Sequence, residues 1–148
     1  MKLKYFEDYE IGQTETAGSY TVDKEEMIAC AKKWDPQPFH VDEEAAQASI
    51  YGGITAPSIY TMAIADWLGH QFEYTMMSLG LLGYDRMEFP APVRPGDKLT
   101  LSSTAIEKRE SQTKRDRGVV RFNVVVSNQK EEPVLKFEAK VMMTKRSY

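Results

Sequence analysis

The second half of the chain alternates apolar and polar residues in the manner of β-strands. The clearest run covers residues 134–144, where one face is apolar (Leu135, Phe137, Ala139, Val141 and Met143) and the other is charged (Lys136, Glu138 and Lys140). A period of two predicts a strand with one face on the core and the other facing water. Residues 77–89, 97–107 and 119–127 are also rich in β-forming side chains and predict three further strands.

The first half of the chain carries the spacing and end signals of helices. After an expected strand over residues 13–22, Asp23 can cap a helix over residues 24–33. A short helix is expected over residues 43–48. Residues 59–68 are apolar almost all round, which is typical of a helix buried on more than one side.

The order of these elements is strand, helices and then several strands joined by short polar connections at residues 108–118 and 128–133. This order predicts an α+β fold whose antiparallel sheet buries one face against the apolar helix. A length of 148 residues fits one domain, covering residues 1–148.

Composition narrows the possible partners. The net charge is -3, so no overall positive field favours nucleic acid. No apolar run reaches the roughly 18 residues of a membrane span, and the first residues lack the apolar core of a signal peptide. We therefore expect a cytoplasmic protein with neither a nucleic-acid nor a membrane partner.

Cys30 is the single cysteine, so no intrachain disulfide and no cysteine metal cluster can form. It lies in an apolar helical pattern, and we expect a small core residue there rather than a nucleophile. The chain has only two histidines, so a histidine metal site would need carboxylate ligands as well, and we expect no metal. His70 follows Gly69 and is expected to end the central helix.

Residues 34–41 contain two prolines, Pro36 and Pro38, and we expect a rigid loop without helix interior. This loop carries Asp35 and His40, five residues apart. Together a carboxylate and an imidazole can hold a water molecule and move protons. The spacing alone equally fits an aspartate that caps a turn and a histidine in a structural hydrogen bond.

Several segments together resemble the MaoC-like acyl dehydratase family, which includes the (R)-specific enoyl-CoA hydratases. They are residues 35–42 (DPQPFHVD), 51–56 (YGGITA), 92–99 (PVRPGDKL) and 128–131 (NQKE). They occur in the family's order and extend over nearly the whole chain.

The resemblance implies a hotdog fold, in which an antiparallel sheet wraps a long helix, and a homodimer or a higher assembly of dimers. It also implies reversible hydration of 2-enoyl-CoA to 3-hydroxyacyl-CoA, as in fatty acid metabolism. The coenzyme A thioester is then the substrate, and no cofactor is needed. Asp35 and His40 match the family's catalytic pair residue by residue.

The resemblance also gives roles to neighbouring residues. Pro57 and Ser58 stand where the family has a Ser-Gly or His-Gly pair, so the Ser58 N–H is expected either to bind the thioester oxygen or only to cap the helix. Gln37 replaces the family's asparagine and either orients the pair or closes the loop. Gly52 and Gly53 either admit the thioester closely or form a plain turn.

Two questions stay open at this level. A basic stretch, Lys108-Arg109 and Lys114-Arg115-Asp116-Arg117, is either a solvated hairpin or a contact for the phosphates of coenzyme A. A hotdog thioesterase and a non-catalytic acyl-CoA-binding protein are the alternatives to a hydratase.

Overall fold

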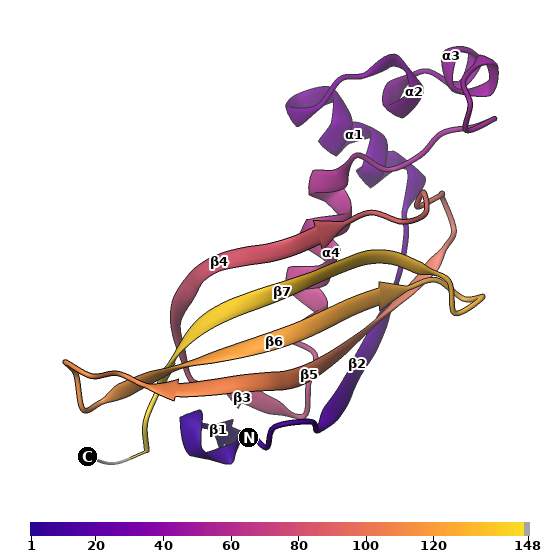
Figure 1. The fold of residues 1–148 in the computed structure, drawn as a ribbon. Helices are drawn as coiled ribbons and strands as arrows, with labels where there is room; N and C mark the ends of the chain where they lie inside the picture. The colour runs from indigo at the N-terminus through magenta and orange to yellow at the C-terminus, as the bar shows by residue number, and fades with distance from the viewer. Residues whose placement is uncertain (147–148) are drawn as a thin grey trace.

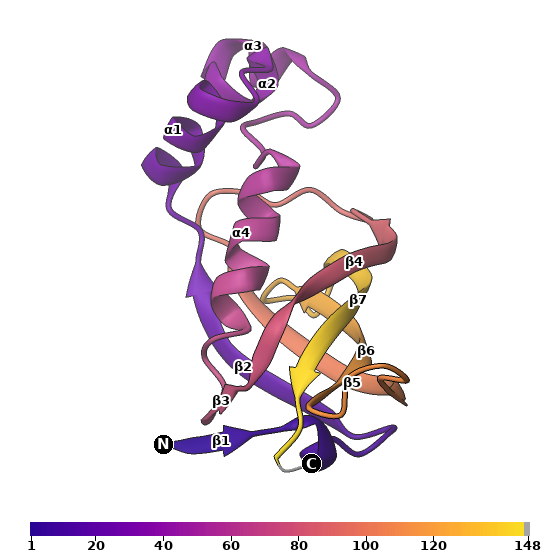
Figure 2. The ribbon, with the colours of Figure 1, turned by 90° about the vertical axis from the view of Figure 1, so that its left-hand side faces the viewer.

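A curved antiparallel sheet and one helix along its inner face form the body of the protein (Figures 1 and 2). The computed structural model describes residues 1–146. The five strands have the order β2-β5-β6-β7-β4. Their bounds are Thr14–Thr21 for β2, Ser78–Glu88 for β4, Lys98–Glu110 for β5, Arg117–Ser127 for β6 and Pro133–Thr144 for β7. The expected α+β architecture is confirmed.

A second, two-stranded sheet was not expected from the sequence. In it, β1 (Lys2–Lys4) pairs in parallel with β3 (Tyr74–Met76). The expected strand over residues 77–89 is observed as β4, and β3 precedes it as an additional short strand, separated from β4 by Met77. The Met77 N–H donates to the Lys4 carbonyl at 2.9 Å, and the Met77 carbonyl accepts from the Thr144 N–H at 2.8 Å. Met77 thus joins the two sheets.

Lys4 anchors β1 to the main sheet although it carries a buried charge. Its ammonium pairs with Glu15 of β2. It also lies 4.4 Å from the ring centres of both Tyr9 and Tyr74. A buried cation is tolerated where a carboxylate and aromatic faces replace its hydration.

Three short helices lie beyond one end of the central helix (Figure 2). They are α1 (Lys24–Trp34), α2 (Pro38–Val41) and α3 (Glu43–Ala48). Asp23 caps α1 as expected, accepting from the Glu26 N–H at 2.9 Å. The expectation of no helix in residues 34–41 is wrong for α2, because Pro38 occupies its first position, where a missing N–H costs no hydrogen bond.

The central helix α4 (Ser58–Leu68) lies against the inner face of the sheet. Its buried residues are Tyr60, Thr61, Ile64, Ala65 and Leu68. The apolar ones belong to the same core cluster as buried side chains of the strands, among them Leu101, Phe122, Val124 and Phe137. The expected burial holds for the face toward the sheet, but the opposite face is exposed, with Ile59 and Trp67 38% and 44% accessible. Within residues 1–146, no helix is long and apolar enough to cross a lipid bilayer.

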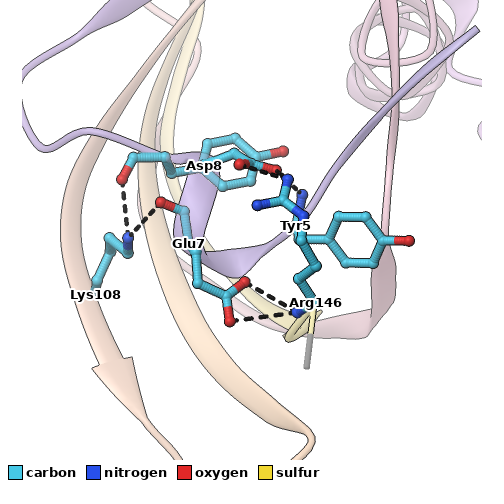
Figure 3. Close-up of polar contacts among 6 residues, drawn as sticks. Tyr5, Glu7, Asp8, Lys108 and Arg146 are labelled. Atoms are coloured by element: carbon cyan, nitrogen blue, oxygen red, sulfur yellow. Dashed lines mark hydrogen bonds and ion pairs between the residues drawn. The ribbon is translucent and has the colours of Figure 1, made fainter. Parts of the chain in front are cut away.

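A polar clasp joins the start of the chain to its end (Figure 3). The Arg146 guanidinium donates to Asp8 at 2.7 Å, and the Arg146 N–H donates to the Glu7 carboxylate at 3.0 Å. Arg146 and the Tyr5 N–H hold the pKa of Asp8 below its ordinary value. Lys108 of β5 donates to the Tyr9 carbonyl at 2.9 Å, so its ammonium holds the same N-terminal segment to the sheet.

The hairpin between β5 and β6 is tighter than expected, since both strands extend to leave only residues 111–116 as the connection. It lies at the opposite end of the sheet from α1, α2 and α3 (Figure 1). At about 3.3 Å per residue, the length of β5 places its two ends roughly 40 Å apart. Lys114 and Arg115 are therefore remote from Asp35 and His40 of the same chain.

Gly118, at the start of β6, has no room for a side chain. A Cβ there would lie 2.5 Å from the Phe6 ring and 2.9 Å from the Arg109 carbonyl. We therefore expect Gly118→Ala to lower the free energy of unfolding by about 1–3 kcal/mol, as overpacking does. Urea denaturation measures this loss. Gly18→Ala in β2 is the control, because its Cβ would meet nothing within 4 Å; equal stability loss in both variants would contradict the expectation.

Candidate active site

Asp35 and His40 are held by consecutive backbone hydrogen bonds at the end of α1. The Asp35 N–H donates to the Ala31 carbonyl at 2.8 Å and closes the last turn of that helix. The Asp35 carbonyl then accepts from the Gln37 N–H, and the Gln37 carbonyl accepts from the His40 N–H, each at 2.9 Å. These bonds fix the separation of the two side chains through the backbone.

The imidazole of His40 has a defined orientation and tautomer. The residue is buried, and its Nδ1 lies 2.6 Å from the Thr55 carbonyl oxygen. A carbonyl oxygen can only accept a hydrogen bond, so Nδ1 carries the proton. In the neutral ring, Nε2 is then an unprotonated acceptor, which is the form a general base requires.

The free nitrogen of His40 faces the carboxylate of Asp35. Nε2 and Asp35 Oδ2 are 3.6 Å apart, too far for a direct hydrogen bond but close enough to contact the same water molecule. The Asp35 side chain is 38% exposed and that of His40 only 9%. The pair thus combines a wet carboxylate with a buried imidazole, and the structure brings the two together.

Both side chains line a hollow of about 390 Å³. Its wall includes α2, the segment after α3, the first turn of α4 and the turn between β4 and β5. The lining residues are Asp35, Phe39, His40, Tyr51, Thr55, Ala56, Ser58, Thr61, Phe89, Pro90, Ala91, Pro92, Val93 and Val134. Gln37, Gly52, Gly53 and Pro57 are not among these described lining residues.

Ser58, the first residue of α4, lines the hollow and places the N-terminus of the helix there. Pro57 is buried and precedes the helix, and its carbonyl accepts from the Tyr60 N–H at 3.0 Å. Within residues 1–146, the Ser58 N–H has no backbone acceptor. Unbonded N–H groups and the helix dipole together favour a negatively charged oxygen at such a position.

The other residues singled out in the sequence lie around the hollow. Gln37 is exposed and contributes its backbone to the loop. Gly52 has φ +64°, a left-handed conformation that favours glycine and indicates a turn. A Cβ at Gly53 would lie 3.5 Å from an Arg94 guanidinium nitrogen, so this glycine packs beside Arg94.

Sequence reasoning missed the contacts that orient His40. Thr55 acts through its carbonyl, which leaves no side-chain signal. The Phe39 ring lies 4.4 Å from the imidazole and 5.3 Å from the Tyr51 ring, measured between centres. The aromatic residue directly before His40, and a second one before the Gly-Gly turn, were the available clues to this packing.

A second cavity of about 300 Å³ lies farther along α4. Apolar side chains form most of its wall: Ala65, Phe72, Met76, Leu81, Tyr84, Leu101, Phe122, Val124, Phe137, Ala139 and Val141. Ser58 and Thr61 line the first hollow, and Ala65 and Gly69 line this cavity. At spacings of three and four residues these positions share one face of α4. The two spaces therefore follow the same side of the helix.

Cys30 and His70 lie apart from the Asp35–His40 hollow. Cys30 is half-buried and packs against the core, close to the expected core position. His70 is exposed, and its N–H donates to the Trp67 carbonyl at 3.0 Å just beyond α4, as expected for a residue that ends the helix.

Comparison of the sequence with known proteins finds a matching family model and similar bacterial proteins. A family model described as "MaoC like domain" matches residues 8–129. An uncharacterised protein of Bacillus subtilis, YdeM, is 34% identical over 146 residues, which cover 97% of this chain and 99% of YdeM. A 3-hydroxyacyl-thioester dehydratase Z of Mycobacterium tuberculosis is 35% identical over 75 residues, covering 49% of each chain.

Solved structures show the same fold. A MaoC-like dehydratase from Rhodospirillum rubrum superposes with a TM-score of 0.88 at 32% identity, covering 98% of this chain and 99% of that protein. A Mycobacterium tuberculosis protein described as a double hotdog fold superposes with a TM-score of 0.83 at 18% identity, covering 96% of this chain and 44% of that one. The hotdog fold is thereby confirmed.

Burial raises the pKa of the Cys30 thiol, and the nearby Glu26 carboxylate adds to the effect. A raised pKa leaves less thiolate at a given pH, and thiolate is the reactive form. We therefore expect the folded protein to react with Ellman's reagent more slowly at pH 7–8 than the urea-unfolded chain, and to gain rate as the pH rises. Because Cys30 is the single cysteine, release of thionitrobenzoate reports this site alone. Equal rates in the two states would contradict the expectation.

Proposed function

The chain belongs to the MaoC-like domain family, and from this premise we propose that it catalyses the reversible addition of water to a 2-enoyl-CoA, giving a 3-hydroxyacyl-CoA. One observation carries the proposal: His40 Nε2, left free by the Nδ1–Thr55 bond, and Asp35 Oδ2 are 3.6 Å apart, and both side chains line the same hollow. The dehydratase Z named above, a 3-hydroxyacyl-thioester dehydratase, supports the reaction class.

The proposed step uses the pair as acid and base. A water molecule between Nε2 and Oδ2 loses a proton to the pair as its oxygen bonds to C3 of the enoyl group. The pair delivers a proton to C2, so one water is added and both side chains return to their starting state. Positioned proton transfer of this kind contributes about 10²–10⁴-fold. The step moves no electrons to or from the substrate and calls for no redox cofactor.

Ser58 completes the proposed site. Negative charge builds on the thioester oxygen while water attacks C3, and the Ser58 N–H at the start of α4 can donate to that oxygen. One such donor is worth about 10²–10³-fold in comparable acyl chemistry. Pro57 provides no second N–H, so this oxyanion site rests on the helix end itself.

The two spaces along α4 support an acyl thioester as the substrate class. The hollow beside Asp35 and His40 presents polar groups where the reacting carbons must lie. The second cavity, on the same side of the helix, is mostly apolar and offers room for an acyl chain. Burial of an apolar chain there is favourable at about 0.8 kcal/mol per methylene group.

Asp35→Asn and His40→Ala test the function directly. We expect each to lower hydration of crotonyl-CoA by about 10²–10⁴-fold, because each removes half of the proton-transfer pair. Loss of the enoyl absorbance measures hydration. Gln37→Ala is the matched control from the same loop: its exposed side chain lies outside the hollow, and we expect an activity close to that of the wild type.

The same assay separates the alternative functions. Release of free thiol without hydration would show a thioesterase. Thermal stabilisation by CoA esters with neither product would indicate a binding protein, to which the Pro57-Ser58 departure points. Full activity in both Asp35→Asn and His40→Ala would contradict the assigned pair.

We further propose a homodimer formed through the edge strand β4. This edge exposes three leucines, Leu79, Leu81 and Leu82, by 47%, 48% and 55%. The other edge strand, β2, exposes hydroxyl-bearing residues instead (Thr14, Thr16, Ser19 and Thr21). An unpaired apolar edge favours pairing with a second copy, which would continue the sheet across a two-fold axis.

Leu82→Lys tests this interface. A charge on the apolar edge should disfavour pairing, and we expect a shift from dimer to monomer by size-exclusion chromatography with light scattering. Ile106→Lys is the control, because Ile106 is an exposed apolar residue of β5, away from the β4 edge. A wild-type monomer, or an unchanged dimer in Leu82→Lys, would argue against a β4 interface.

A further inference from the structure

Arg94, in the turn between β4 and β5, reaches across to the segment after α3. Its guanidinium donates to the Tyr51 carbonyl at 2.6 Å. The base of the side chain is fixed as well, since the Arg94 N–H donates to Asp97 at 2.9 Å within the same turn. A residue outside the lining of the hollow thus holds a residue that lines it.

The segment from Tyr51 to Ala56 is attached to the turn at both of its ends. At one end is the Arg94–Tyr51 bond, and at the other the Ala56 N–H donates to the Val93 carbonyl at 2.8 Å. The Thr55 carbonyl, which accepts from His40 Nδ1, belongs to the same peptide group as the Ala56 N–H. The Val93 bond therefore sets the direction of this carbonyl, while the Arg94–Tyr51 bond holds the other end of the segment.

A second route joins the same segment to His40. The Tyr51 ring packs on Phe39, and the Phe39 ring packs on the imidazole. A shift of Tyr51 would change this packing together with the hydrogen bond at Thr55. Both contacts that orient the imidazole therefore start from the segment that Arg94 holds.

The positive charge of Arg94 is directed at the Tyr51 carbonyl. Within the described chain, no carboxylate lies within salt-bridge distance of its guanidinium. A hydrogen bond from a charged donor is roughly twice as strong as a neutral one. The guanidinium also lies against Gly53, where a side chain would come within 3.5 Å of it.

We propose that Arg94 is a positioning residue: its bond to the Tyr51 carbonyl holds the Tyr51 end of the segment that contacts the imidazole, and so keeps His40 Nδ1 bonded to the Thr55 carbonyl with Nε2 facing Asp35. The catalytic consequence rests on the proposed hydratase function, whereas the effect on the tautomer does not. Without the guanidinium, the Ala56–Val93 bond still ties the segment at one end. The Tyr51 end is then released, Phe39 loses the ring that packs against it, and the imidazole can turn away from the Thr55 carbonyl while the fold persists.

Nitrogen NMR of the imidazole rings tests the proposal. The chain has two histidines, so His70 serves as an internal reference beside His40. We expect the wild type to show a pure Nδ1–H tautomer at His40, and Arg94→Ala to show mixed tautomers there with His70 unchanged. In the hydration assay kcat should fall by about 10²-fold with KM changed far less, since misplacing a catalytic group by about 1 Å has an effect of this size.

Two further variants make the test specific. Arg94→Lys keeps a charged donor but not the planar fork, and we expect it to give tautomers and kcat between those of the wild type and Arg94→Ala. It also carries the test if Arg94→Ala does not fold. Arg109→Ala, an exposed arginine at the far end of β5, is the control and should leave the His40 signals unchanged.

The outcomes separate the two proposals. A His40 tautomer that is unchanged in both Arg94 variants would overturn the positioning role. Mixed tautomers in Arg94→Ala, together with a wild type that does not hydrate any enoyl-CoA, would uphold the positioning role and reject the hydratase function.

Discussion

The candidate site depends on one hydrogen bond, from His40 Nδ1 to the Thr55 carbonyl. This bond decides which nitrogen of the imidazole is free, and it sets the ring plane relative to Asp35. An imidazole without it could present either nitrogen to the hollow. In the proposed mechanism, the carboxylate, the helix end at Ser58 and the surrounding hollow all act together with the ring nitrogen that this bond leaves free.

The architecture supplies this bond from elements far apart in the chain. His40 follows α1, Thr55 precedes α4, and Arg94 lies between two strands of the sheet. The sheet contributes rigidity: β5 is paired on both sides, and the turn before it is held at Arg94 and Asp97. Precision at the site thus comes from attachment to the sheet rather than from the short helices that carry Asp35 and His40.

The sequence predicted the α+β class, the buried helix over residues 59–68 and most of the main sheet, because periodicity and capping residues act locally. It also placed Asp35 and His40 on one proline-constrained segment, although His40 lies in the short helix α2 rather than in a loop. The pairing of β1 with β3 was missed because it joins residues more than 70 positions apart in two short strands. Thr55 and Arg94 were missed as orienting residues because one acts through its backbone and the other through a long-range contact.

The clasp at Arg146 and the bond at His40 differ in their physical character. Arg146 and Asp8 are charged partners with side chains 53% and 22% exposed, so dissolved ions screen their attraction. The His40–Thr55 bond joins an imidazole N–H to a carbonyl and is buried, which shields it from such screening. Ionic strength should therefore act on the two chain ends while leaving the geometry around the imidazole intact, so a saline environment can loosen one region of this protein without retuning the other.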